Sequence, residues 1–234
     1  MASLIAGAAW WIQPSTRPTE RGPQPAPVSS AVAVPQEKGE LGHVPPPRVA
    51  LDSLSSDPGF ARWLQEAGLV ERVVAAVAAV AEGNSPREPL SFLAPQGAFT
   101  VSERKTGTFI SPASHARYDG VTRVFCSLDA QAVAGVYATL RPSLSATFAT
   151  LARPGARFDQ ALQSSIQSML EVPVVRGEVE VVPRGAVWAY KDASLEALNP
   201  AQKHLLRMGP QNVARIQDKL RELSSALELK LARR

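Results

Sequence analysis

Cysteine and histidine are scarce in this 234-residue chain, which has one cysteine and three histidines. With Cys126 alone, no disulfide can form within the chain, and a zinc site made of cysteines is excluded. Its apolar neighbours Phe125 and Leu128 are typical of a buried, unreactive thiol. The histidines are scattered and lack the spacing of metal ligands. The sequence therefore indicates neither a metal nor a cofactor.

Glycine-rich phosphate loops and interleaved aromatic residues are also missing. No segment that reads as a strand is followed by the glycine pattern of a nucleotide-binding loop. Residues 203–234 hold 8 basic and 3 acidic side chains, so the formal net charge of +4 comes from the C-terminal segment. Because no aromatic residue alternates with those charges, we do not expect a stacking platform for nucleic acid.

No apolar run is long enough for a complete membrane-spanning helix, which needs about 20 residues. Residues 1–12 are uncharged and end near Trp10 and Trp11, and tryptophan is enriched at the membrane interface. We expect residues 1–12 to be a partial transmembrane anchor, the outer half of a helix that begins upstream of the recorded start. A signal peptide and an apolar N-terminus on a soluble protein are the alternatives. Arg17 and Arg21 count against the anchor because positive charge favours the cytoplasmic side.

Prolines are concentrated behind this segment. Residues 13–47 contain nine of the twenty prolines and no phenylalanine, tyrosine or tryptophan. Such a stretch cannot bury enough apolar surface to offset the entropy of ordering. We expect a disordered linker that extends on the order of 100 Å. The globular domain then spans residues 48–234, which is enough for one sizeable core.

Helical periodicity dominates that domain. Asp57 followed by Pro58 is a helix-start signature, and Asp129 is a second cap. Apolar residues recur at helical spacing in 69–82, 112–125, 130–151 and 158–170. Pro142 is expected to kink the third of these helices.

Two pairs of segments instead suggest hairpins. Residues 98–102 and 106–110 flank a charged turn at 103–105, and residues 178–182 and 186–190 flank a turn at 183–185. The sequence therefore predicts a predominantly helical α+β fold, a single domain with two short β-hairpins after the disordered proline-rich linker.

A final helix is predicted from Pro210 to the C-terminus. Its apolar residues form a seam: Val213, Ile216, Leu220, Leu223 and Leu227. The seam covers about two heptads, fewer than the three or four of a coiled coil. It either packs on its own domain, which we favour, or forms a weak homodimer.

Several polar segments resemble an uncharacterised bacterial family, the domain of unknown function 3014. These segments are Ile110-Ser111-Pro112, Arg117-Tyr118-Asp119, Ser127-Leu128-Asp129-Ala130, Tyr137, Arg157-Phe158-Asp159 and residues 201–212. The resemblance covers about residues 50–225. It implies an N-terminal membrane helix, a proline-rich linker and one domain facing the periplasm, and it implies no reaction.

A catalytic interpretation finds little support. Ser111, Ser114, His115 and Asp119 contain the residue types of a nucleophile, a base and an orienting acid. Ser111, however, is better explained as the cap of the helix that Pro112 begins. We therefore assign no catalytic residue.

Five other residues are the better candidates for a ligand-binding site: Arg117, Tyr118, Asp119, Lys203 and Arg207. In one interpretation they form a structural network, in which Asp119 accepts from an arginine and Tyr118 is half buried. In the other, the three basic residues hold an anionic or peptide-like ligand, for which arginine supplies a bidentate fork.

These observations together predict a bacterial envelope protein. We expect a single-pass inner-membrane protein whose globular domain is a non-enzymatic binding or interaction module in the periplasm, with a protein or an anionic ligand as partner. The alternatives are an envelope hydrolase with an unrecognised site and a soluble cytosolic domain that dimerises through its C-terminal helix.

Overall fold

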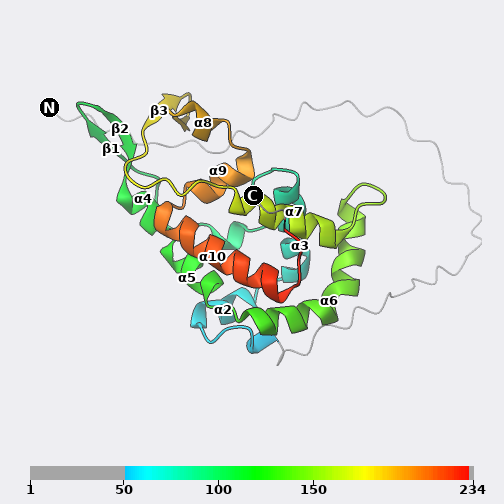
Figure 1. Cartoon of the computed structure of the whole chain (residues 1–234). Helices are drawn as coiled ribbons and strands as arrows, with labels where there is room; N and C mark the ends of the chain where they lie inside the picture. The colour runs from blue at the N-terminus through cyan, green and yellow to red at the C-terminus, as the bar shows by residue number, and fades with distance from the viewer. Residues whose placement is uncertain (1–50, 232–234) are drawn as a thin grey trace, which may run out of the picture. The chain divides into compact units, whose positions relative to one another are not determined.

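The computed structural model describes residues 51–231 (Figure 1). The predicted anchor at 1–12 and linker at 13–47 lie outside these residues and stay predictions. Helices dominate the described part, and four short strands form two antiparallel pairs. The predicted class, a mainly helical α+β fold with two β-hairpins, is confirmed.

The described residues form helices, several of which begin at a side-chain cap. These helices are α2 (Pro58–Trp63), α3 (Leu69–Ala81), the 3-10 helix η1 (Ser91–Leu93), α4 (Pro112–Ala116), α5 (Asp119–Cys126), α6 (Ala130–Leu151), α7 (Phe158–Leu170), α8 (Ala193–Glu196), α9 (Pro200–Leu206) and α10 (Pro210–Ala226). Asp57 accepts from the backbone N–H of Gly59, and Asp129 from that of Ala132. Asn199 and Gln202 form a capping box at α9. Side-chain caps supply partners for backbone N–H groups that a helix start leaves unpaired.

Helices α3, α6 and α7 share one apolar cluster. Its buried members are Val74, Leu140, Leu144, Phe148 and Phe158. Helix α6 runs from Ala130 to Leu151, as predicted, and contains Pro142. Figure 1 shows α6 changing direction along its length, which agrees with the predicted kink.

Helix α10 packs against α5, α6, α7 and α9. Val213 is fully buried and Leu223 is 7% exposed, so much of the predicted seam is used within the domain. The helix ends at Ala226 rather than at the C-terminus. Glu228 then takes a left-handed conformation with φ of 53°, which a continuing helix does not allow. The homodimer stays a prediction.

The hairpins have tighter turns than predicted. Strand β1 (Val101–Arg104) pairs with β2 (Gly107–Ile110), and β3 (Val181–Arg184) pairs with β4 (Val187–Tyr190). Each turn has two residues, at 105–106 and 185–186. Gly185 has a φ of 60°, and tight hairpin turns require a positive φ. The predicted turns at 103–105 and 183–185 are therefore wrong in position.

The two hairpins also meet each other. The Ile110 N–H donates to the Val179 carbonyl at 3.0 Å, and Phe109 forms an antiparallel bridge with Glu180. A core cluster lies under them and includes Ile110, Val181, Tyr190, Leu205 and Val213. Because Tyr190, Leu205 and Val213 belong to this one cluster, β4 packs with the helices α9 and α10.

The predicted helix over 112–125 is two helices, because α4 ends at Ala116 and α5 begins at Asp119. The Asn212 side chain lies at the break: its amide nitrogen is 3.3 Å from the His115 carbonyl and 2.8 Å from the Asp119 carboxylate. The same nitrogen is 2.9 Å from the Met208 carbonyl. Asn212, more than ninety residues further along the chain, thus links the end of α4 to the start of α5.

Candidate functional site

Three of the five candidate residues, Arg117, Tyr118 and Arg207, take part in arginine–tyrosine contacts. The fourth member of these contacts is Tyr190. The Arg207 guanidinium lies over the ring of Tyr190, 5.7 Å from its centroid, and the Arg117 guanidinium lies 5.6 Å from the centroid of Tyr118. Both distances suit a cation–π contact. Tyr118 and Arg207 both act on the pKa of Tyr190. We call Arg117, Tyr118, Tyr190 and Arg207 the tyrosine–arginine cluster.

Neither arginine of this cluster has a carboxylate partner in residues 51–231. Arg117 donates only to carbonyl groups, those of Gly97 at 2.7 Å and Ser114 at 3.3 Å. The Arg207 side chain has neither a hydrogen bond nor an ion pair to the described part of the chain. Two positive charges therefore stand beside two tyrosine rings without compensation from a carboxylate.

Lys203 is engaged elsewhere. Its ammonium group donates to the Glu196 carbonyl at 3.0 Å and to the Glu196 carboxylate at 3.1 Å. That carboxylate also accepts from the backbone N–H of Tyr190 at 3.0 Å. The pKa of Glu196 is lowered, first by this backbone donor and then by Lys203. Lys203 thus sits beside the cluster as half of an ion pair.

Asp119 does tie helices together, as one interpretation predicted, but its partner differs. It accepts from the amide of Asn212 on α10 at 2.8 Å, and not from an arginine. Tyr118 is partly buried, as that interpretation expected. The predicted arginine donor is wrong because the arginine next to Asp119, Arg117, turns to the carbonyls of Gly97 and Ser114.

Tyr190 was not among the predicted site residues. It is 5% exposed, and its hydroxyl group has no hydrogen-bond partner within 51–231. Burial raises the pKa of Tyr190 to about 12, and Arg207 opposes this rise. The ring is therefore a fixed, neutral platform under Arg207. No sequence pattern connected the Tyr190 ring with Arg207.

The serines and the histidine that were considered for catalysis, Ser111, Ser114 and His115, each make other contacts. Ser111 caps α4 and hydrogen-bonds Thr100, and the buried hydroxyl of Ser114 donates to the Thr100 carbonyl. His115 packs closely against Gly209, and burial lowers its pKa. Each group thus has a structural role.

A different serine and histidine do meet. The Ser85 hydroxyl is 3.0 Å from Nδ1 of His204. Burial lowers the pKa of His204, and the nearby charges of Arg207 and Arg87 lower it further. Within residues 51–231 no carboxylate hydrogen-bonds this ring, so the pair lacks the orienting acid of a triad.

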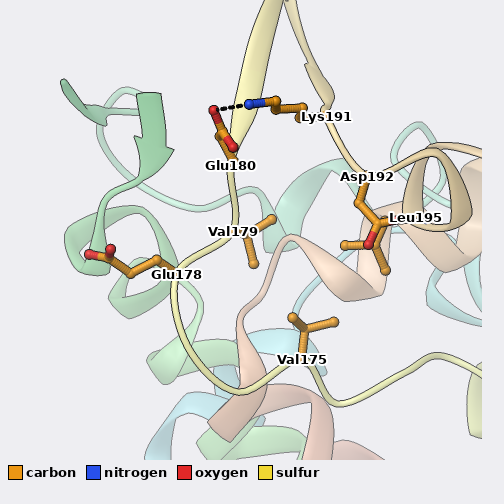
Figure 2. Close-up of a pocket in the computed structure, with 7 residues that line it drawn as sticks. All are labelled: Val175, Glu178, Val179, Glu180, Lys191, Asp192 and Leu195. Carbon is orange, nitrogen blue, oxygen red and sulfur yellow. Dashed lines mark hydrogen bonds and ion pairs between the residues drawn. The ribbon is translucent and has the colours of Figure 1, made fainter. Parts of the chain in front are cut away.

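A surface hollow of about 360 Å³ lies at the base of the second hairpin (Figure 2). Val175, Val179 and Leu195 line it together with Glu178, Glu180, Lys191 and Asp192. Its acids are all engaged: Glu178 pairs with Arg104 at 2.5 Å, and Figure 2 shows Lys191 reaching to Glu180, at 2.7 Å. Asp192 caps α8, and bonds from Ser194 lower its pKa. Each carboxyl group of the hollow is therefore already held by a partner, which leaves none of them poised as a general acid.

A second hollow of about 290 Å³ lies between α6 and α7. Asp159 at its edge accepts from the Tyr137 hydroxyl at 2.5 Å, pairs with Arg141 and stands 3.9 Å from Arg157. The pKa of Asp159 is lowered, first by Arg141 and then by Tyr137. The pKa of Tyr137 is raised by burial and by Asp159. These four residues form what we call the aspartate network.

Metal-ligating groups and membrane-spanning helices were the two remaining features of interest in residues 51–231. In the described residues, no group of three or more histidines, cysteines, aspartates or glutamates is placed to hold a metal ion. No helix within 51–231 combines the length and apolar character needed to cross a membrane.

A family model described as "Protein of unknown function (DUF3014)" matches residues 69–224, more than half of the chain. This confirms the family that the sequence segments resembled. No curated protein matches, and no solved structure matches.

Proposed function

Because the chain belongs to this family, whose description names no activity, we propose a function from its own residues. The globular domain is a non-enzymatic binding module that holds an anionic group through Arg117 and Arg207. The observation that carries the proposal is that each guanidinium lies on a tyrosine ring and has no carboxylate partner in the described residues.

The geometry explains why such arginines suit an anion. The Arg207 guanidinium lies over an aromatic ring and makes no hydrogen bond to residues 51–231, so its donors are available, whereas Arg117 uses two of its donors on carbonyl groups. Guanidinium donors match the oxygens of a carboxylate or phosphate. Tyr190 is buried and Tyr118 partly so, and the two rings limit the freedom of both arginines before a ligand arrives. Less entropy is then lost on binding. Asp119 and Lys203 support the site by holding its helices, through Asn212 and Glu196.

The location of this module is part of the proposal. Residues 1–12 would anchor the chain in the inner membrane, and residues 13–47 would let the domain reach a partner in the periplasm. The support is the apolar, tryptophan-ended segment and the nine prolines behind it. A periplasmic reporter fusion that includes the upstream codons, combined with cell fractionation, tests this part. Recovery only in the soluble cytosol would contradict it.

Binding is tested with sulfate as the probe, by isothermal titration calorimetry at constant ionic strength in chloride. We expect Arg207→Ala to lose sulfate binding, while its melting temperature falls by no more than a few degrees, since no ion pair is removed. The matched control is Arg221→Ala, which removes an exposed arginine of α10 that pairs with Asp218. This control should bind sulfate like the natural protein. Loss of folding in Arg207→Ala would instead support a purely structural network.

A further inference from the structure

His204 lies on α9, three residues before Arg207, which caps the C-terminal end of that helix, so both side chains lie on one side of it. The imidazole is largely buried, and its only hydrogen bond in the described part of the chain joins Nδ1 to the Ser85 hydroxyl at 3.0 Å. A titratable group is therefore fixed next to the arginine that the proposed function assigns to an anion.

The charges that act on this imidazole are both positive. Arg207 caps the end of α9, and Arg87 comes from the segment that follows α3. Lys203 beside it is paired with Glu196. The helices packed on α9 also carry ionisable groups, which include Asp159 on α7, Glu171 at the end of α7, and Arg215 and Asp218 on α10. Protonation of the ring is thus opposed by the like charges of Arg207 and Arg87.

We propose that binding of an anion at Arg207 is coupled to proton uptake by His204, so that the site binds its anion more tightly as the pH falls. This inference rests on the proposed function. An anion on Arg207 cancels part of the positive field at the imidazole and makes its protonation easier. Linkage is reciprocal, so protonated His204 raises the affinity for the anion by the same factor.

The direction of the effect follows from the two pKa values of His204. In the free protein burial and the two arginines hold this pKa below its ordinary value. With the anion bound, the pKa is higher, because the repulsion from Arg207 is reduced. Affinity is therefore constant at pH values above the bound-state pKa and increases as the pH falls towards the free-state pKa.

Hydrogen bonding permits both states of the ring. A neutral imidazole has one donor and one acceptor nitrogen, whereas both nitrogens of the protonated ring are donors. The Ser85 oxygen can accept from Nδ1 in the protonated state, and its own hydrogen is then free to turn towards another acceptor. The contact with Ser85 thus survives the change in charge.

The test measures the Kd of sulfate by calorimetry between pH 5 and pH 8, since sulfate does not titrate in this range. We expect Kd to be about 5-fold lower at pH 5 than at pH 8, a typical size for coupling between neighbouring sites. Proton uptake on binding, read from titrations in two buffers with different ionisation heats, should accompany it. His204→Gln, which can still hydrogen-bond Ser85, should bind sulfate with a Kd that does not depend on pH. His115→Gln is the control and should keep the dependence.

The outcomes separate the two proposals. Sulfate binding that requires Arg207 but has the same Kd at every pH overturns the coupling and leaves the binding site standing. No Arg207-dependent binding at any pH overturns the proposed function as well. The NMR titration of His204 in the natural protein, with and without sulfate, needs no variant. A pKa that does not rise when sulfate is added overturns the coupling.

Discussion

Two clusters in this protein contain a tyrosine and an arginine, and they differ in one partner. In the aspartate network, the Tyr137 hydroxyl and Arg141 both bond Asp159. In the tyrosine–arginine cluster, Tyr190 and Arg207 touch through ring and guanidinium, and neither polar group has a partner in 51–231. The first arrangement satisfies its own charges and joins α6 to α7. In the second arrangement, the Arg207 guanidinium keeps donors that an anionic ligand could use.

The difference arises from how the nearest carboxylates are used. Asp159 sits at the start of α7 with its oxygens directed to Tyr137 and Arg141. Glu196 lies close enough to Tyr190 to act on its pKa, but the Tyr190 backbone and Lys203 occupy it. A polar cluster should therefore be judged by its unpaired groups rather than by its residue types.

The largest effect on stability is expected from Asp159→Ala. The substitution removes the acceptor of Tyr137 and the partner of Arg141, and it leaves a partly buried hydroxyl without its bond. We expect the free energy of unfolding in urea to fall by about 2 kcal/mol. A change below about 0.5 kcal/mol would show that the network does not hold α6 to α7.

Tyr137→Phe should have an intermediate effect. It deletes only the hydroxyl that donates to Asp159, while the ring keeps its packing with Phe158. Asp159 retains Arg141, so the free energy of unfolding should fall by about 1 kcal/mol. Urea denaturation measures it, and an unchanged midpoint would mean that water replaces the tyrosine at no cost.

Tyr190→Phe should have the smallest effect, although Tyr190 is the more deeply buried tyrosine. Its hydroxyl has no partner to lose within the described residues, so we expect a change between zero and a stabilisation of about 1 kcal/mol. Because Tyr137 and Tyr190 undergo the same chemical change, the pair is a matched comparison. A loss for Tyr190→Phe equal to that of Tyr137→Phe would reveal a hidden partner and remove the distinction between the clusters.

Local signals predicted much of the fold. Helix α6 was predicted from end to end because Asp129 caps its start and apolar residues recur along it. The break at 117–118 was missed because it depends on Asn212, which the chain brings in from α10. The hairpin turns were misplaced because the charged and proline residues that suggested them pair within the strands, as Arg104 does with Gly107 and Pro183 with Trp188.

The candidate site was predictable only in part. The sequence identified Arg117, Tyr118 and Arg207, because arginine is suited to anions. It could not identify Tyr190, since only tertiary packing places the end of β4 under α9. The pairing of Lys203 with Glu196 likewise depends on how the chain turns between α8 and α9.

The contrast between the clusters is tested most directly by one measurement, the shift in melting temperature that sulfate causes at constant ionic strength. It is measured in parallel for the natural protein, Arg141→Ala and Arg207→Ala. We predict equal shifts for the natural protein and Arg141→Ala, because Arg141 already has its carboxylate. Arg207→Ala should show no shift beyond the general effect of the salt. An equal shift in all three proteins would contradict the assignment of Arg207 to an anion.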